Sequence, residues 1–167
     1  DVIRQRWFEN QRAMGIVPEG TTLAPRNPGV EPWDGLSQAH RDLYARMQET
    51  FAGFLDHTDK QIGRLIDFLE LIGVLDDTLI VLLSDNGASQ DGGKHGTLNE
   101  LAYFNLIRTP IEDMLARADE IGGPNVYNNY PWGWAQAGNT PLRFYKQNTY
   151  EGGIRDPLIV HWPNGVN

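Results

Sequence analysis

The amino-acid sequence predicts an α/β protein on two observations, a long helical repeat of apolar residues and two short runs typical of buried strands. Residues 38–72 repeat apolar side chains at helical spacing. Two short runs, TLIVLLS at residues 78–84 and DPLIVHW at residues 156–162, are apolar at consecutive positions, which is typical of central parallel strands covered by helices on both faces. Two such strands are too few for a stable sheet, because each needs hydrogen-bonded neighbours. We therefore expect residues 1–167 to be the central part of a single larger domain.

Local signals assign the other elements. Residues 2–14 are predicted to form a helix closed by Gly15, and four prolines make residues 16–35 a long ordered loop. Ser37 is the expected N-cap of the long helix, which should end at Gly73.

The stretch between the two strands has fewer signals. TPIE, at residues 109–112, has the form of a capping box and predicts a short helix that runs to Ile121 and stops at a pair of glycines. The aromatic residues at positions 127, 130, 132 and 134 are predicted to pack a long loop onto the domain, with an aryl-substrate pocket as the alternative.

Composition excludes several classes of protein. The formal net charge of −8 argues against a nucleic-acid partner, because phosphate binding needs concentrated lysine and arginine. The chain has no cysteine, and so no disulfide, thiolate metal site or cysteine nucleophile. Since no run approaches the roughly 18–20 apolar residues that span a bilayer, no membrane partner is expected. The compartment and the oligomeric state are left open.

Asp85 and Asn86 stand side by side where the first predicted strand ends, in the segment SDNG. In open α/β sheets, ligands bind beyond the carboxyl ends of the strands. A carboxylate and an amide oxygen are hard ligands suited to Ca²⁺ or Mg²⁺, although two ligands do not complete a site. The alternative is an Asx turn, in which the two side chains accept hydrogen bonds from backbone amides around Gly87. The segment by itself leaves both interpretations open.

Three ordered segments carry a resemblance to a known family. They are DDTLIVLLSDNGAS at residues 76–89, YPWGWAQAGNT at residues 130–140 and TPLRFYKQNTYEGGIRDPLIVHWPNG at residues 140–165. In this order, and with the helix DHTDKQIGRLIDFLELIGVL before the first of them, they resemble the sulfatases, in particular the bacterial arylsulfatases. The resemblance extends over most of the chain.

The resemblance implies a fold similar to alkaline phosphatase, with a mostly parallel sheet between helices and the active site at the strand ends. It implies that Asp85 and Asn86 bind Ca²⁺, or Mg²⁺ in some members, together with acids from the N-terminal part of the protein. Lys146 matches the lysine that contacts the sulfate group, and a sulfate ester is the expected small-molecule substrate. A fixed cation suits this chemistry, because cleavage of the ester places negative charge on the sulfuryl oxygens.

Two further groups of residues are candidates for the same region. Lys94 and His95, in the segment DGGKHG, follow the metal motif closely and could border the substrate pocket. Glu151 and the two glycines after it are expected to shape a turn, since paired glycines permit backbone angles that other residues resist.

The nucleophile of the family is a formylglycine made from cysteine or serine in a CxPxR or SxPxR motif. This chain contains neither motif, so the formylglycine is expected outside it, and the 167 residues alone are expected to be inactive. One alternative is a phosphonate or phosphate monoester hydrolase of the same superfamily, because the metal motif does not distinguish sulfur from phosphorus. Another is a catalytically inactive, sulfatase-like binding module.

Overall fold

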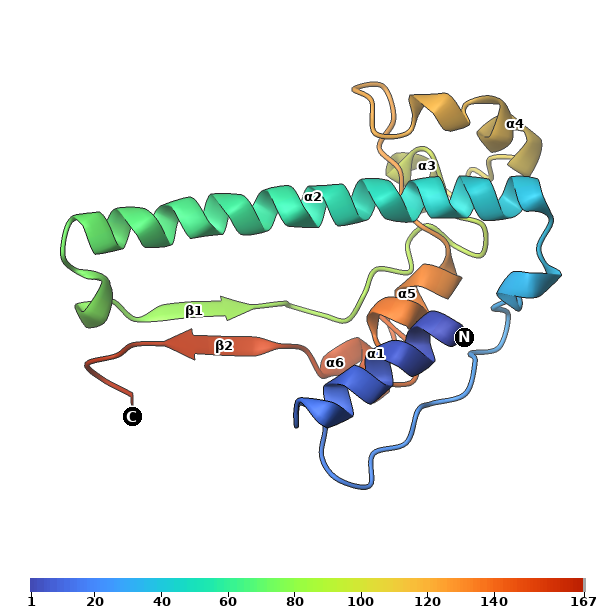
Figure 1. Ribbon diagram of the computed structural model, residues 1–167. Helices are drawn as coiled ribbons and strands as arrows, with labels where there is room; N and C mark the ends of the chain where they lie inside the picture. Colours follow the sequence, from blue (N-terminus) through green and yellow to red (C-terminus); the bar gives the residue numbers. More distant parts are fainter. Residues whose placement is uncertain (167) are drawn as a thin grey trace.

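The computed structural model describes residues 1–166. The other elements are arranged along one long helix, α2, Gln38–Leu71, which runs nearly the whole length of the molecule (Figure 1). Ser37 caps it, because its side-chain oxygen accepts a hydrogen bond from the backbone N–H of His40 at 3.2 Å. The chain leaves the helix through Gly73, where φ is +73°. The predicted helix, its N-cap and its glycine end are confirmed, and its 34 residues span roughly 50 Å.

Helix α1, Val2–Ala13, precedes α2 and has nearly the predicted bounds. The connection over residues 16–35 is ordered against the rest of the chain through the buried side chain of Gln136. That amide accepts a hydrogen bond from Asn27 N and donates one to Pro25 O, both at 2.9 Å. The prediction of a long ordered loop is confirmed.

Strands β1, Ile80–Leu83, and β2, Leu158–His161, form a two-stranded sheet. They pair antiparallel, with Leu83 opposite Leu158. The prediction of parallel strands is wrong for this pair, because an apolar run indicates burial of both faces and says nothing about the direction of the partner. Within residues 1–166 each strand has only the other as a neighbour, and Leu83 and Leu158 remain 59% and 63% exposed.

Short helical segments make up the remaining regular structure. They are η1 (Trp33–Gly35), η2 (Leu75–Asp77), α3 (Glu100–Phe104), α4 (Ile111–Ala116), η3 (Ala118–Glu120), α5 (Trp132–Gly138) and α6 (Glu151–Ile154). The capping box predicted at Thr109 is wrong, because the N-cap is Pro110, which has extended backbone and no side-chain cap. The single helix predicted to reach Ile121 is divided into α4 and η3.

A backbone clasp closes the segment that carries α3, α4 and η3. Thr97 and Asn129 exchange two backbone hydrogen bonds of 3.0 Å. Next to them, Trp132 N donates to Gly93 O at 2.9 Å. Residues 98–128 therefore form an excursion of the chain that begins and ends at one place, and Leu98, Met114 and Ile121 within it pack in the hydrophobic core.

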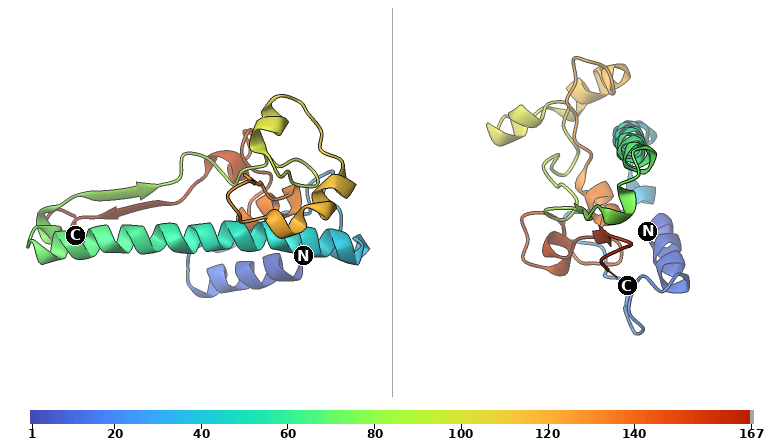
Figure 2. Two further views of the ribbon diagram at one scale, coloured as in Figure 1. Left: turned by 90° about the horizontal axis from the view of Figure 1, so that it is seen from above. Right: turned by 90° about the vertical axis from the view of Figure 1, so that its left-hand side faces the viewer.

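The hydrophobic core lies against the N-terminal half of α2. Its buried members are Leu43, Tyr44, Met47, Leu98, Met114, Ile121, Tyr130, Ala135 and Tyr145. The C-terminal half of α2 runs beside the β1–β2 ribbon (Figures 1 and 2), and Phe68 and Leu71 on it are 53% and 83% exposed. In residues 1–166, none of the helices combines the length and the apolar character that crossing a bilayer requires.

Candidate functional site

The antiparallel pairing places the segment after β1 beside the segment before β2. The last residue of β1 faces the first residue of β2, and Ser84 N donates to Pro157 O at 3.3 Å. Asp85 and Asp156 therefore lie at the same end of the ribbon. Burial and then the charge of Asp85 raise the pKa of Asp156. Carboxylate charge collected at this end favours a nearby cation.

Residues 84–89, which contain Asp85 and Asn86, are called the metal-motif segment. The side chain of Asn139, which follows α5, joins this segment to the segment around Lys146. Its Oδ1 accepts a hydrogen bond from Ala88 N at 2.9 Å. Its Nδ2 donates to Phe144 O at 3.0 Å and also to Gly152 O. A single half-buried amide thus connects the segment around Ala88, which is 51 residues away along the chain, with the nearby backbone of Phe144 and Gly152.

Glycines allow these pieces of chain to approach closely. Gly87 N donates to Gly153 O at 3.2 Å. A Cβ added to Gly87 would lie 1.8 Å from Gly152 O, and one added to Gly152 would lie 2.3 Å from Phe144 O. The glycines after Glu151 belong to α6 and have no positive φ. They are needed here for space, whereas the sequence suggested a need for unusual backbone angles.

We expect the change Gly87→Ala to destabilise the protein, because the new methyl group would overlap the backbone of Gly152, which cannot rotate away as a side chain can. Overpacking of this kind costs about 1–3 kcal/mol in the free energy of unfolding. Urea unfolding of the full-length protein measures the loss. Gly53→Ala on α2 is the matched control, since nothing lies within 4 Å of its added Cβ and alanine favours a helix. Equal unfolding midpoints for Gly87→Ala and the parent protein would contradict the close approach.

The Asx-turn interpretation of Asp85 and Asn86 is wrong, because the backbone amides that it needs are used elsewhere. Gly87 N donates to Gly153 O, and Ala88 N donates to the side chain of Asn139. The Nδ2 group of Asn86 donates to Gly87 O at 2.9 Å, which turns its Oδ1 away from that backbone. Asp85 is exposed and Asn86 half-buried. Their oxygens suit a hard divalent cation, although in residues 1–166 no group of three acidic, histidine or cysteine side chains is placed to hold one.

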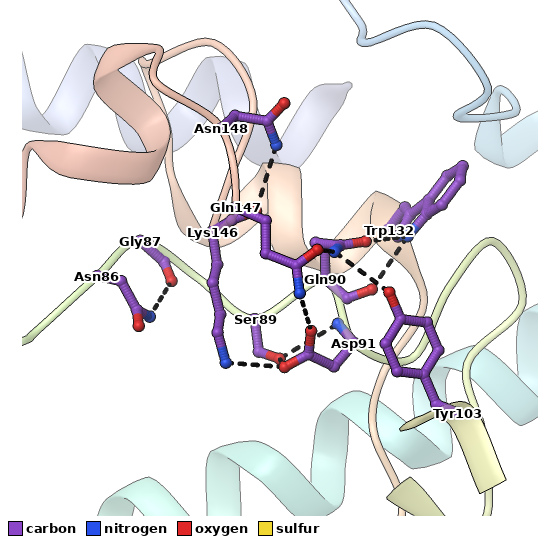
Figure 3. A network of polar contacts seen from close by, with 10 residues as sticks. All are labelled: Asn86, Gly87, Ser89, Gln90, Asp91, Tyr103, Trp132, Lys146, Gln147 and Asn148. Atoms are coloured by element: carbon purple, nitrogen blue, oxygen red, sulfur yellow. Dashed lines mark hydrogen bonds and ion pairs between the residues drawn. The ribbon is translucent and has the colours of Figure 1, made fainter. Parts of the chain in front are cut away.

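Lys146 lies next to the metal-motif segment and points its ammonium group at Asp91 (Figure 3). Its backbone N–H donates to Ala88 O at 3.1 Å, and its Nζ lies 2.8 Å from Asp91 Oδ2. The hydrogen bond to Asp91 raises the pKa of Lys146, so the side chain is positively charged at neutral pH. One third of the Lys146 side chain, 33%, is exposed to solvent.

Asp91 is the residue of this region that the sequence did not reveal. Its side chain is completely buried and receives hydrogen bonds from three side chains. Lys146 and Ser89 donate to Oδ2 at 2.8 and 3.1 Å, and Gln147 donates to Oδ1 at 3.0 Å. No signal in the surrounding sequence indicates this role, because the partner lysine is 55 residues away along the chain.

Lys94 and His95 lie in the wall of a separate cavity of about 360 Å³. Lys94 forms an ion pair with Glu31, and His95 shares a hydrogen bond with the hydroxyl group of Tyr44. Burial and the charge of Lys94 lower the pKa of His95. Among the described residues, those that line this cavity do not include Lys146. The structure therefore does not unite these two residues with the site built around Lys146.

The aromatic residues at positions 127–134 have different environments. Tyr130 belongs to the core, and Trp132 donates its ring N–H to Gln90 O at 3.0 Å. Trp134 lines the cavity beside Lys94 and His95, whereas Tyr127 is 67% exposed. Packing onto the domain describes Tyr130, Trp132 and Trp134, as the sequence predicts, and does not describe Tyr127.

Comparison with known protein families shows to which family the chain belongs. The family model for sulfatases matches residues 8–167. The chain belongs to the sulfatase family. Its α/β elements are those of an incomplete domain of the alkaline-phosphatase-like type to which sulfatases belong.

Individual sulfatases match nearly the whole chain. An uncharacterized sulfatase of Schizosaccharomyces pombe is 34% identical over 164 residues, which cover 98% of this chain and 28% of that protein. The arylsulfatase of Klebsiella aerogenes is 26% identical over 164 residues, with 98% and 33% covered. The N-acetylgalactosamine-6-sulfatase of Mus musculus is 24% identical over 163 residues, with 93% and 23% covered. The chain thus spans about a quarter to a third of the length of these relatives.

Proposed function

We infer that this chain is the central part of the catalytic domain of a sulfuric ester hydrolase of the arylsulfatase type. One observation carries the inference. The backbone amides that would occupy Asp85 and Asn86 are bonded to Gly153 and Asn139, which leaves two hard oxygen ligands at a strand end beside the cation of Lys146. Membership of the sulfatase family supports the reaction class.

Asp85 and Asn86 would hold a divalent cation, Ca²⁺ with Mg²⁺ as the alternative, through a carboxylate and an amide oxygen. When bound, the cation supplies positive charge against the sulfuryl oxygens and lowers the barrier to cleavage. The remaining ligands are expected in other parts of the full-length protein. The exposed position of Asp85 suits this arrangement, since its carboxylate has room for ligands from elsewhere.

Lys146 would bind the sulfuryl group through the donors that Asp91 does not use. An ammonium group carries three N–H donors on a compact charge, and one of the three is taken by Asp91 Oδ2. The other two are available to sulfuryl oxygens, on which charge develops during the reaction. Lys146 is therefore assigned as a catalytic cation.

The nucleophile would come from outside the 167 residues, which contain no CxPxR or SxPxR motif. A formylglycine in the upstream part of the protein is the expected group. Without an attacking group, a metal site and a lysine have no covalent step to assist. The chain alone is accordingly expected to be inactive towards sulfate esters.

Lys94 and His95 are proposed to belong to a substrate pocket, which is the cavity that they line with Trp134. This cavity has an aromatic wall and mixed charges, which suit a ligand that is part apolar and part ionic. In this proposal the pair contacts the body of the substrate and not its sulfuryl group.

The reaction class is tested on the full-length protein with 4-nitrophenyl sulfate and 4-nitrophenyl phosphate. We expect a higher kcat/KM for the sulfate ester. A higher kcat/KM for the phosphate ester would favour the phosphonate or phosphate monoester hydrolase, because both substrates share the same leaving group. Divalent metal binding with no turnover of either ester would favour the catalytically inactive binding module.

A further inference from the structure

We propose that Asp91 is a positioning residue, whose buried carboxylate fixes the ammonium group of Lys146 in the place where it meets the sulfuryl group. This proposal rests on the proposed function of Lys146. It adds a residue from a different segment to the site, because Asp91 belongs to the loop after the metal motif and Lys146 to the segment before α6. Asp91 acts through Lys146 and is not expected to touch the substrate.

The geometry of Asp91 is that of a fixed anchor. Its side chain has no exposed surface, and all three of its side-chain donors approach from defined directions (Figure 3). Ser89 reaches the same oxygen as Lys146, and Gln147 holds the other oxygen. A carboxylate with both oxygens engaged cannot rotate freely. Its position, and therefore the position of the lysine ammonium group, is set before any ligand binds.

A second chain of contacts restrains Gln147 itself. Its Oε1 accepts a hydrogen bond from Gln90 Nε2, and the Oε1 of Gln90 accepts one from the ring N–H of Trp132 at 3.0 Å. The network around Asp91 is thereby tied to α5. Among the three donors to Asp91, Lys146 is the charged one, and one third of its side chain is open to solvent, so it is the member of the network suited to an anionic ligand.

Restraint of the lysine matters because its side chain is long and flexible. A free lysine loses much of its rotamer freedom when it is ordered. If Asp91 orders the side chain during folding, substrate binding does not have to do so. Preorganised charge of this kind stabilises a transition state more than the same charge on a mobile side chain. A purely structural ion pair would instead stabilise the fold with no specific effect on turnover.

A double-mutant cycle in the full-length enzyme separates these roles. We expect Asp91→Asn, which keeps the shape and removes the charge, to lower kcat/KM for an aryl sulfate about 10-fold, as loss of an orienting partner does at ligating side chains. In a Lys146→Ala background, Asp91→Asn should cause no further loss, because the residue acts through the lysine. Equal losses in both backgrounds would overturn the proposal, as would parent-like activity of folded Asp91→Asn.

A second variant avoids the risk that a change at a buried position prevents folding. Gln147 is exposed, and Gln147→Ala frees Oδ1 of Asp91 while the ion pair remains. We expect kcat/KM to fall severalfold, again only when Lys146 is present. Unchanged kcat/KM in Gln147→Ala would overturn the proposal if Asp91→Asn does not fold.

Two controls complete the design. Asp56→Asn removes another lysine–aspartate pair, the exposed one with Lys60 on α2, and should leave turnover unchanged. Lys146→Ala alone tests the proposed function. If it retains full activity, the assignment of Lys146 fails and the role of Asp91 fails with it. If it loses activity while Asp91→Asn does not, the role of Asp91 alone is wrong.

Discussion

Replacing Asp85 by alanine in the full-length sulfatase is expected to abolish tight Ca²⁺ binding and, with it, turnover of sulfate esters. In the proposed metal site, the carboxylate of Asp85 would supply the negative charge, which the amide of Asn86 cannot replace. Residues that merely orient ligands are worth 10–100-fold in metal affinity, so loss of a ligand is expected to exceed about 100-fold. Isothermal titration calorimetry with Ca²⁺ measures the change.

The fold should be little affected by Asp85→Ala, because the side chain is exposed. Asp59→Ala, at an exposed position on α2, is the matched control and should bind Ca²⁺ as the parent protein does. Unchanged Ca²⁺ affinity of Asp85→Ala would remove this residue from the metal site. Loss of affinity in both variants would indicate a general effect of net charge.

Replacing Lys146 by alanine is expected to lower kcat for an aryl sulfate on the order of 100-fold, since the loss of one fixed donor to developing charge has this size. The effect should appear mainly in kcat, because the interaction strengthens as charge develops in the transition state. Steady-state kinetics at saturating Ca²⁺ provide the test. Near-parent kcat would contradict the assignment.

The structure adds a cost in stability that the sequence did not suggest. Lys146→Ala leaves the buried carboxylate of Asp91 without its cation, although Ser89 and Gln147 still donate to it. A loss of about 1–3 kcal/mol in the free energy of unfolding is expected. The kinetics are therefore measured well below the unfolding temperature, which thermal unfolding of the variant establishes.

The sequence predicts the structure correctly where residues close together in the chain determine it. Helix α2 has an apolar stripe, a serine cap and a glycine end, and each of these signals lies within a few residues of what it determines. Thr109 shows the limit of such signals. The capping-box pattern was present, but Pro110 took the N-cap position and its extended backbone started the helix one residue later.

Relationships between distant segments were harder to predict. The apolar runs of β1 and β2 identified both strands, but their antiparallel pairing depends on how the intervening chain turns back. At the site, Asp85, Asn86 and Lys146 were named from motifs. The role of Asp91 cannot be predicted in this way, because it depends on complete burial beside a lysine 55 residues away, which no local pattern encodes.

The backbone clasp between Thr97 and Asn129 has a consequence for how sulfatases of this type can diverge. Residues 98–128 begin and end at hydrogen-bonded partners, and within this excursion Met114 and Ile121 pack in the core that includes the first turns of α2. Loop-closure entropy grows slowly, by only about 0.6 kcal/mol for each doubling of length. Insertions and deletions in its exposed stretch, residues 104–108, are therefore expected to be tolerated, because Met114 and Ile121 stay in the core. They can remodel the surroundings of the site while Asp85 and Lys146 keep their separation.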